Sequence, residues 1–266
     1  TVITKTGLAF EPNLFISFTM PHNIISSGVV GNHYVAMGLA LSAANQCSIN
    51  FGDVHNITPS EVFLRLSDSK LSHAVATDQT IALTTVNSDG YVITRSSSTG
   101  SSTICILAAR LETPVSLSIQ DTPITTGTHL LDIGIAAKQL FFIMSLAAAT
   151  NTTYTNTNSQ GLSFGTINSG DAHSYGIVST DGSTASDSES YFSSSVLLRS
   201  AIGTTALNFA HSDDTVDGPE LTWTNVTGTA KKMIVLGIEE SEPPSSLVAQ
   251  LDFSNIDNSQ YIVLEF

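Results

Sequence analysis

The sequence predicts an all-β protein made of two tandem copies of a small antiparallel β-sandwich, jelly-roll-like or barrel-like, followed by a strand-like C-terminal tail. β-Branched residues and turn formers dominate the 266 residues, and the acidic–basic pairs that decorate surface helices are missing. Short apolar runs such as Leu14–Phe18 have the length of buried strands. The Asp89-Gly90 pair favours a hairpin, because glycine accepts a positive φ without steric cost. Together these features are typical of sandwiches and barrels.

The second observation behind this prediction is a repeat at a constant offset of 128 positions, the separation of Gly90 and Gly218. The same offset aligns Asp53 with Asp181. It also aligns apolar positions, namely Leu14 with Phe142, Ile16 with Met144, Leu39 with Ile167, Ile49 with Ile177, and Ile106-Leu107 with Ile234-Val235. A period of this length exceeds a solenoid repeat and has the size of a domain. It predicts a first β domain at residues 1–113, a linker at 114–128, a duplicate domain at 129–241 and a tail at 242–266.

Each copy contains short apolar stretches that predict strands in order along the chain. In the first copy they span residues 14–18, 33–41, 45–51, 61–66, 80–86, 91–94 and 103–111. In the second they span residues 140–144, 161–167, 173–179, 190–199, 205–211, 221–224 and 231–239. Residues 136–149 are rich in Ala, Leu and Met, which favours a helix, but the analogy with residues 14–18 favours a strand. In the linker, Val115, Leu117 and Ile119 alternate as in a short connecting strand.

The charge of the chain bears on its partners. The formal net charge is −14, from 23 acidic and 9 basic residues. Phosphate contacts require clusters of Lys and Arg, so a nucleic-acid partner is not expected. Only 12% of the residues are charged, and Ser, Thr, Asn and Gly replace them, as is common in extracellular and virion β proteins. No apolar run reaches the roughly 18 residues of a membrane span, so no membrane partner is expected.

No catalytic or cofactor motif has a convincing context in the sequence. Ser67-Asp68-Ser69-Lys70 matches the Ser-x-x-Lys motif of penicillin-recognising acyl transferases, but that motif needs a helix, and this segment is predicted as a loop. The seven histidines never occur as a close pair at metal-ligand spacing. No glycine-rich phosphate loop precedes a helix. We therefore expect no enzyme and no cofactor.

Carboxylates gather around two predicted turns of the second copy. Calcium takes several oxygen ligands from such loops, but the EF-hand spacing is missing, so solvated turn acids are favoured over a weak calcium site. The candidates at the first turn are Asp213, Asp214, Asp217 and Glu220. Those at the second are Asp181, Asp187 and Glu189.

Three further features are interpreted as structural. Trp223, the single tryptophan, is expected to be a buried core anchor beside Leu221 or Val235. Cys47 and Cys105 lack a CxxC context and have no cysteine in the second copy, which favours two buried thiols over a disulfide. The tail is expected to pair as an assembly strand along a sheet edge, and a neighbouring subunit is favoured over the same chain. The residues that would carry this contact are Phe253, Tyr261, Ile262 and Val263.

Several short segments of the second copy carry a resemblance to a known family. They are Leu162-Ser163-Phe164-Gly165, His173-Ser174-Tyr175-Gly176, Ser179-Thr180-Asp181-Gly182 with Ser186-Asp187-Ser188, Val196-Leu197-Leu198-Arg199, and Asp217-Gly218-Pro219-Glu220-Leu221-Thr222-Trp223-Thr224. This series resembles a β domain, often in tandem, of structural proteins of tailed phages and prophages. It covers about 110 residues of the second copy. In the first copy Tyr91-Val92-Ile93 is the fainter counterpart, with Arg95 in place of the tryptophan.

The resemblance implies a non-enzymatic virion protein that decorates or reinforces the capsid or occupies a vertex. Its implied partners are the major capsid protein or neighbouring copies in a homo-oligomer. The alternative is a tail or fibre protein that binds a host receptor or glycan, with Tyr154, Tyr175 and Tyr191 as the tyrosines able to stack on sugars. A polysaccharide hydrolase would need two carboxylates on opposed strands in a cleft, and the sequence identifies no such pair.

Overall fold

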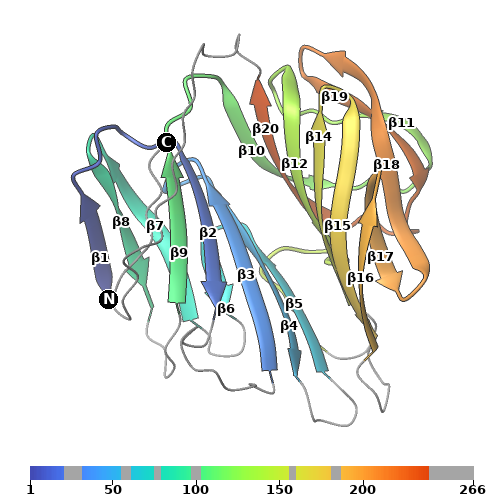
Figure 1. Ribbon diagram of the computed structural model, residues 1–266, viewed down its shortest axis with the longest axis horizontal. Helices are drawn as coiled ribbons and strands as arrows, with labels where there is room; N and C mark the ends of the chain where they lie inside the picture. The colour runs from blue at the N-terminus through green and yellow to red at the C-terminus, as the bar shows by residue number, and fades with distance from the viewer. Residues whose placement is uncertain are drawn as a thin grey trace.

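The computed structural model of the chain describes residues 1–20, 32–54, 61–74, 79–96, 103–155, 160–180 and 187–239. Over these residues the protein is all-β, with no helix and with antiparallel pairing between all neighbouring strands. The strands form four sheets that follow one another as layers from left to right in Figure 1. The predicted fold class is confirmed at the level of an all-β, sandwich-like fold.

The N-terminal half supplies the first two layers. The order β1-β8-β7-β6 forms one sheet, called here the N-small sheet, and β5-β4-β3-β2-β9 forms most of a second, the N-large sheet. The strands are β1 (Val2–Thr6), β2 (Leu14–Met20), β3 (Asn32–Ala40), β4 (Gln46–Val54), β5 (Glu61–Ser67), β6 (Ser72–Ala74), β7 (Gln79–Asn87), β8 (Gly90–Arg95) and β9 (Thr103–Ala109).

The C-terminal half supplies the other two layers. The C-large sheet has the order β10-β20-β12-β14-β15-β16, and the C-small sheet has the order β11-β19-β18-β17. The strands are β10 (Val115–Asp121), β11 (Gly127–Leu130), β12 (Ala137–Ser145), β13 (Thr153–Thr155), β14 (Gln160–Asn168), β15 (Asp171–Thr180), β16 (Asp187–Ser193), β17 (Val196–Ala201), β18 (Thr204–Thr215), β19 (Gly218–Asn225) and β20 (Lys232–Glu239).

The strand orders of the two halves correspond. The series β1-β8-β7-β6 matches β11-β19-β18-β17, and β9-β2-β3-β4-β5 matches β20-β12-β14-β15-β16. Details of the hairpin ends also correspond. The backbone N–H of Leu8 donates to the carbonyl of Asp89, and the N–H of Ile133 donates to the carbonyl of Asp217, both at 2.9 Å. At Gly218, φ is +144°, a conformation that favours glycine.

Two strands cross from one half to the other. β10 follows β9 in the chain but pairs with β20, from Val115 opposite Ile238 to Asp121 opposite Lys232. β13 lies between β12 and β14 in the chain but pairs with β5, so that it extends the N-large sheet. The segment predicted as a linker, 114–128, therefore contains β10 and the start of β11.

Three apolar cores fill the spaces between the four layers. Phe15, Tyr91 and Ile93 belong to the core between the N-small and N-large sheets, and Phe142 and Trp223 to the core between the C-large and C-small sheets. The middle core joins the two large sheets and includes Leu14, Leu39, Ile49, Ile143, Ile234 and Leu236. The central strands of the large sheets are therefore buried on both faces, which explains why β2 and β12 are apolar over most of their length rather than alternating.

The offset of 128 holds only in part of the structure. It matches Ile49 with Ile177, both of which pack in the middle core. In β2 and β12, however, Leu14 belongs to the middle core and Phe142 to the C-terminal core, so the predicted pairing joins opposite faces. Opposite faces are also joined by the pairs Ile16–Met144, Leu39–Ile167 and Ile106–Ile234. These four pairings are wrong, since a shift of one residue turns every side chain of a strand to the other face.

An offset of 127 restores the faces in these strands. It pairs Phe15 with Phe142 and Ile106 with Met233, all in the core of their own half. It also pairs Ala109 with Leu236, both in the middle core. Some loops of the two halves thus differ in length by one residue. An alignment without gaps cannot include such differences.

Of the other strands expected from the sequence, one is confirmed and one is wrong. Residues 137–145 form β12, so the strand was the correct choice over the helix. The single strand predicted over 190–199 is wrong: β16 and β17 belong to different sheets. The chain turns at Ser195, whose N–H donates to Ser193 Oγ and whose carbonyl accepts from Ser174 Oγ.

The short strands β1, β6 and β13 were not predicted. Asp53 lies in β4, whereas Asp181 and the whole tail, residues 242–266, lie outside the described residues.

Candidate functional site

The most distinctive exposed feature of the described residues is a row of aromatic side chains on the face of the C-large sheet that looks toward the N-large sheet. Phe164 of β14 lies opposite Tyr175 of β15, and Tyr175 lies opposite Phe192 of β16. Ile143 of β12, on the other side of Phe164, is fully buried in the middle core. The row therefore runs from the buried core between the halves to the edge of the sheet. We call Phe164, Tyr175 and Phe192 the aromatic row.

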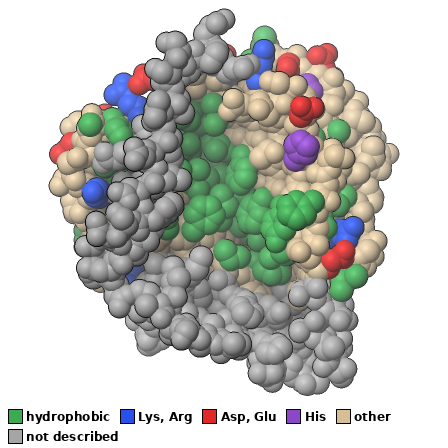
Figure 2. Space-filling view, viewed as in Figure 1, with side chains coloured by type: hydrophobic (Ala, Val, Ile, Leu, Met, Phe, Trp, Pro, Cys, Tyr) green, Lys and Arg blue, Asp and Glu red, His purple; other side chains and the backbone are tan. Residues whose placement is uncertain are grey.

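Exposure increases along the row. Phe164 is half-buried and stacks on Phe141, with ring centroids 6.4 Å apart and planes at 17°. Tyr175 is 38% exposed and Phe192 is 83% exposed, and their centroids are 4.9 Å apart. Figure 2 shows hydrophobic side chains gathered in a hollow on this side of the molecule. An aromatic ring as exposed as Phe192 is uncommon on a surface with no partner.

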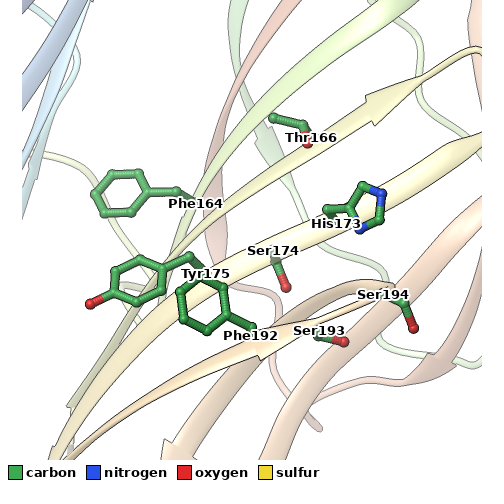
Figure 3. Close-up of a pocket in the computed structure, with 8 residues that line it drawn as sticks. All are labelled: Phe164, Thr166, His173, Ser174, Tyr175, Phe192, Ser193 and Ser194. Atoms are coloured by element: carbon green, nitrogen blue, oxygen red, sulfur yellow. The ribbon is translucent and has the colours of Figure 1, made fainter.

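The row borders a shallow pocket of about 610 Å³. Its polar wall consists of Thr166, His173, Ser174, Ser193 and Ser194. In Figure 3 the three rings lie together on one side, and His173 and the serines lie on the other. None of these lining residues carries a carboxylate, an ammonium or a guanidinium group. The pocket can therefore bind apolar surface and form hydrogen bonds, and its lining offers no pair of acids for proton transfer.

The outward position of the row depends on the opposite face of the same strands. Gly176 of β15 has no side chain because the ring of Tyr191 occupies that space: a Cβ atom there would lie 2.2 Å from Tyr191 Cζ. The Tyr191 hydroxyl accepts from the N–H of Arg199 at 2.9 Å and donates to the carbonyl of Leu197 at 3.4 Å. The Arg199 guanidinium lies 4.7 Å from the centroid of the Tyr191 ring and pairs with Glu189.

These contacts fasten β16 to β17. Burial raises the pKa of Tyr191, so its hydroxyl stays protonated and keeps its donor. Because Tyr191 points inward, its neighbour Phe192 must point outward. The pocket thus lies on the exposed face of strands whose opposite face is packed against β17.

Only one of the three tyrosines predicted to stack on sugars belongs to this site. Tyr175 lies in the aromatic row. Tyr191 is 5% exposed and is engaged with Arg199. Tyr154 lies in β13, and its hydroxyl accepts from the N–H groups of Ala148 and Ala149 in the preceding loop, at 3.1 and 2.8 Å. Phe164 and Phe192 were not predicted as site residues, although their spacing from Tyr175 could have indicated a shared face once the strand pairing was known.

The acidic residues of the first turn lie on the β18–β19 hairpin, far from the row in the chain. Asp213 lies opposite Glu220, and its carboxylate accepts from the N–H of Asp214 at 2.9 Å. A hydrogen bond of 2.8 Å joins the Asp214 carboxylate to His211 Nε2, and Asp217 is exposed in the turn. Among the described residues, no group of three or more His, Cys, Asp or Glu is arranged to hold a metal ion. At the second turn, Glu189 pairs with Arg199.

The remaining predicted residues have structural surroundings. Trp223 is 2% exposed and packs on Phe209 with centroids 4.2 Å apart, in the same core as Leu221 and Val235, as expected. Ser67 ends β5, and the segment to Lys70 is a bend rather than a helix. Cys47 and Cys105 form no disulfide. Cys47 is buried and Cys105 only half-buried.

Comparison of the chain with family models, with curated proteins and with solved structures gave no match. Within the described residues, no helix has the length and apolar character needed to cross a membrane.

Proposed function

We propose that the chain is a non-enzymatic structural protein of a tailed-phage virion that decorates or reinforces the capsid or occupies a vertex. The observation that carries this proposal is the aromatic row, whose rings become increasingly exposed from the packed middle core to the edge of the C-large sheet. Interfaces between proteins are enriched in Tyr and Phe at positions that become buried on assembly. The placement in a virion rests on the resemblance of the second half to phage structural domains.

The two halves are proposed to be duplicates of one sandwich domain. Their matching strand orders and matching hairpin hydrogen bonds support this. Each half has a small sheet and a large sheet packed face to face, which favours a sandwich over a closed barrel. A duplicated domain can occupy repeated positions in a lattice, and this suits a shell protein that contacts the major capsid protein or further copies of itself.

The test uses particles assembled with a tagged full-length chain in cells that carry the genome from which its gene derives. Purified particles are expected to contain the chain, and Phe192→Ser is expected to reduce its copy number per particle. Val216→Ser is the matched control, because Val216 is 80% exposed on the β18–β19 turn, away from the row. Absence of the wild-type chain from purified particles would contradict the proposal. A high copy number supports the shell, and a low one supports a vertex, tail or fibre.

The second candidate is a tail or fibre protein that binds a host glycan. The observation that favours it is the pocket itself, where the rings of Tyr175 and Phe192 face hydroxyl groups and His173. Binding of a panel of bacterial surface glycans, lost in Tyr175→Ala but retained in Val216→Ser, would support this role over subunit contact.

A further inference from the structure

A second pocket lies beside β13, and it shares no lining residue with the pocket of the aromatic row. Its volume is about 530 Å³, and we call it the β13 pocket. It is lined by Tyr154 on β13, by Gln160 at the start of β14 and by Ser200 near the end of β17. Leu146, which follows β12, and Lys231, which directly precedes β20, complete its frame. Segments that are distant in the sequence thus converge on one pocket.

The walls of the β13 pocket are held in place by the main chain. The backbone N–H of Lys231 donates to Thr122 Oγ1 at 2.9 Å, and the Lys231 carbonyl accepts from the N–H of Thr122 at 2.8 Å. Next to Gln160, a Cβ atom on Gly161 would lie 2.0 Å from the Arg199 carbonyl oxygen, so β14 approaches β17 closely at this point. The fold itself therefore forms the pocket, and a ligand would meet its walls already in position.

The charge of the lining favours an anion. Of the described residues that form the β13 pocket, only Lys231 is charged. Among the described residues, no carboxylate lies within ion-pair distance of its ammonium, whereas the neighbouring Lys232 pairs with Asp121. The formal net charge of the chain is −14, but exposed charges more than about 8 Å apart are largely screened at physiological ionic strength. Lys231 therefore sets the local preference of the pocket.

Gln160 gives the pocket an unused hydrogen-bond acceptor. It is 9% exposed, and its Oε1 atom accepts no hydrogen bond from any described residue. Buried side-chain oxygens usually have a partner. The terminal torsion of glutamine is broad, so a small rotation of the amide group turns this oxygen toward a donor in the pocket. A hydroxyl group of a ligand is such a donor.

The rest of the lining combines hydroxyl groups with apolar surface. The hydroxyl groups belong to Ser200, Thr227 and Thr229, and the apolar surface to Leu146, Ala148 and the ring of Tyr154. A sugar presents the matching features, since its hydroxyl groups both donate and accept and its ring has faces of C–H groups. An Asp or Glu side chain would satisfy Lys231, but it carries no hydroxyl beside its carboxylate. The lining therefore favours a sugar that also bears a negative charge.

We propose that the β13 pocket binds a carboxylated sugar of the hexuronic acid class. The carboxylate pairs with the Lys231 ammonium, a ring hydroxyl donates to Gln160 Oε1, and a C–H face of the ring packs on Leu146 and Tyr154. The site is separate from the aromatic row, and it does not depend on the place of the chain in a virion. Subunit contact at Phe192 and sugar binding at Lys231 can therefore be tested independently.

The test is a titration of the full-length chain with D-glucuronic acid, followed by heteronuclear NMR. Saturable shifts are expected at the backbone amides of Gln160 and Lys231, and none at Tyr175 in the aromatic row. D-Glucose lacks the carboxylate, and acetate lacks the hydroxyl groups. Each should bind more weakly than glucuronic acid by roughly tenfold or more, because each loses part of the hydrogen bonding.

Two substitutions separate the contributions of the side chains. Lys231→Gln should reduce the affinity for glucuronic acid to that for glucose, and it keeps the contacts with Thr122 because the Lys231 main chain makes them. Lys5→Gln is the matched control, since it makes the same charge change on β1 in the N-small sheet. Gln160→Leu should weaken the binding of both sugars and leave that of acetate unchanged.

Four outcomes would overturn the inference. The first is a lack of saturable binding of glucuronic acid. The second is equal affinity for acetate, which would indicate a site for a carboxylate alone, such as an acidic side chain of a partner protein. Shifts centred on Tyr175 would place the sugar at the aromatic row, and unchanged binding by Lys231→Gln would exclude the β13 pocket.

Discussion

The two halves share one strand order. They differ most at one edge of their large sheets, which is formed by β5 in the N-terminal half and by β16 in the C-terminal half. In the N-large sheet, β5 is covered by β13, a strand that the C-terminal half contributes. In the C-large sheet, the corresponding β16 has no neighbour beyond it among the described residues, and it carries the exposed Phe192. One edge has thus been used to join the halves, while the other presents an aromatic surface.

The covered edge shows how the halves are held together. Arg65 Nη1 donates to Thr153 Oγ1 at 2.9 Å, and the N–H of Asn151 donates to the carbonyl of Leu66. Asp68 accepts from Thr150 Oγ1 at 2.8 Å and from Asn151 Nδ2 at 2.5 Å. These polar contacts lie at one edge of the apolar middle core, to which Leu64 and Leu66 of β5 belong, so the halves are expected to unfold as one unit.

The largest expected effect is on the cores of the separate halves. Trp223→Ala and Tyr91→Ala, on the corresponding strands β19 and β8, should each lower the free energy of unfolding by about 3–5 kcal/mol, because each removes a buried ring. Tyr91 packs edge-on against Phe15 at 5.2 Å, and Trp223 packs on Phe209. Both variants should show a single denaturant transition by tyrosine fluorescence and by circular dichroism.

Phe192→Ala is the control for this pair, since an exposed ring should change stability by only about 0.5 kcal/mol. Two separate transitions, with each substitution affecting only its own half, would contradict the coupling through the middle core.

A second expected effect concerns Cys47 in the middle core. Burial raises the pKa of the Cys47 thiol from 9.0 to about 12, because the thiolate is poorly solvated there. The neutral thiol therefore favours the folded state fully below pH 9, and this contribution is lost as the pH rises toward 12. In a Cys105→Ser background at pH 8, Cys47 should react with a thiol reagent only as fast as the halves separate or unfold. Reaction at the rate of an exposed thiol would show that the middle core is open in solution.

The smallest expected effect concerns Asp68 at the covered edge. Hydrogen bonds, first from Asn151 and then from Thr150, lower the pKa of Asp68 below 3.8. The ionised carboxylate therefore adds stability above about pH 4, and this is lost as the pH falls through the lower folded value. Since Asp68 is exposed, Asp68→Asn should cost at most about 1 kcal/mol at pH 7, and less towards pH 2. Asn151→Gly keeps the positive φ of this position while removing the donor, so the two substitutions should not be additive in thermal melts.

Local features of the sequence predicted local features of the structure. The Asp-Gly pairs mark hairpin ends because only glycine fits there: a Cβ on Gly90 would lie 2.0 Å from the Lys5 carbonyl oxygen, and Gly218 has a positive φ. The burial of Trp223 follows from its size and apolar character. The strand at residues 137–145 was recoverable from its likeness to β2.

Features that depend on distant pairing were not recoverable in the same way. β1, β6 and β13 are short, and β13 owes its place to β5, more than 80 positions earlier. The aromatic row was missed because both faces of the C-large sheet carry apolar residues, so the pattern of β15 does not tell which face meets solvent. The faces of β2 and β12 were misassigned because a gap of one residue reverses them.

The pairing of β13 with β5 at the edge of the N-large sheet can form only late in synthesis. Arg65 and Thr153, which meet in this pair, are 88 positions apart. At roughly 5–20 residues per second, the ribosome needs several seconds to deliver Thr153 after Arg65. Once β9 has also been delivered, the described strands β1 to β9 can pair with one another while β5 is still uncovered and open to a chaperone or a second nascent chain.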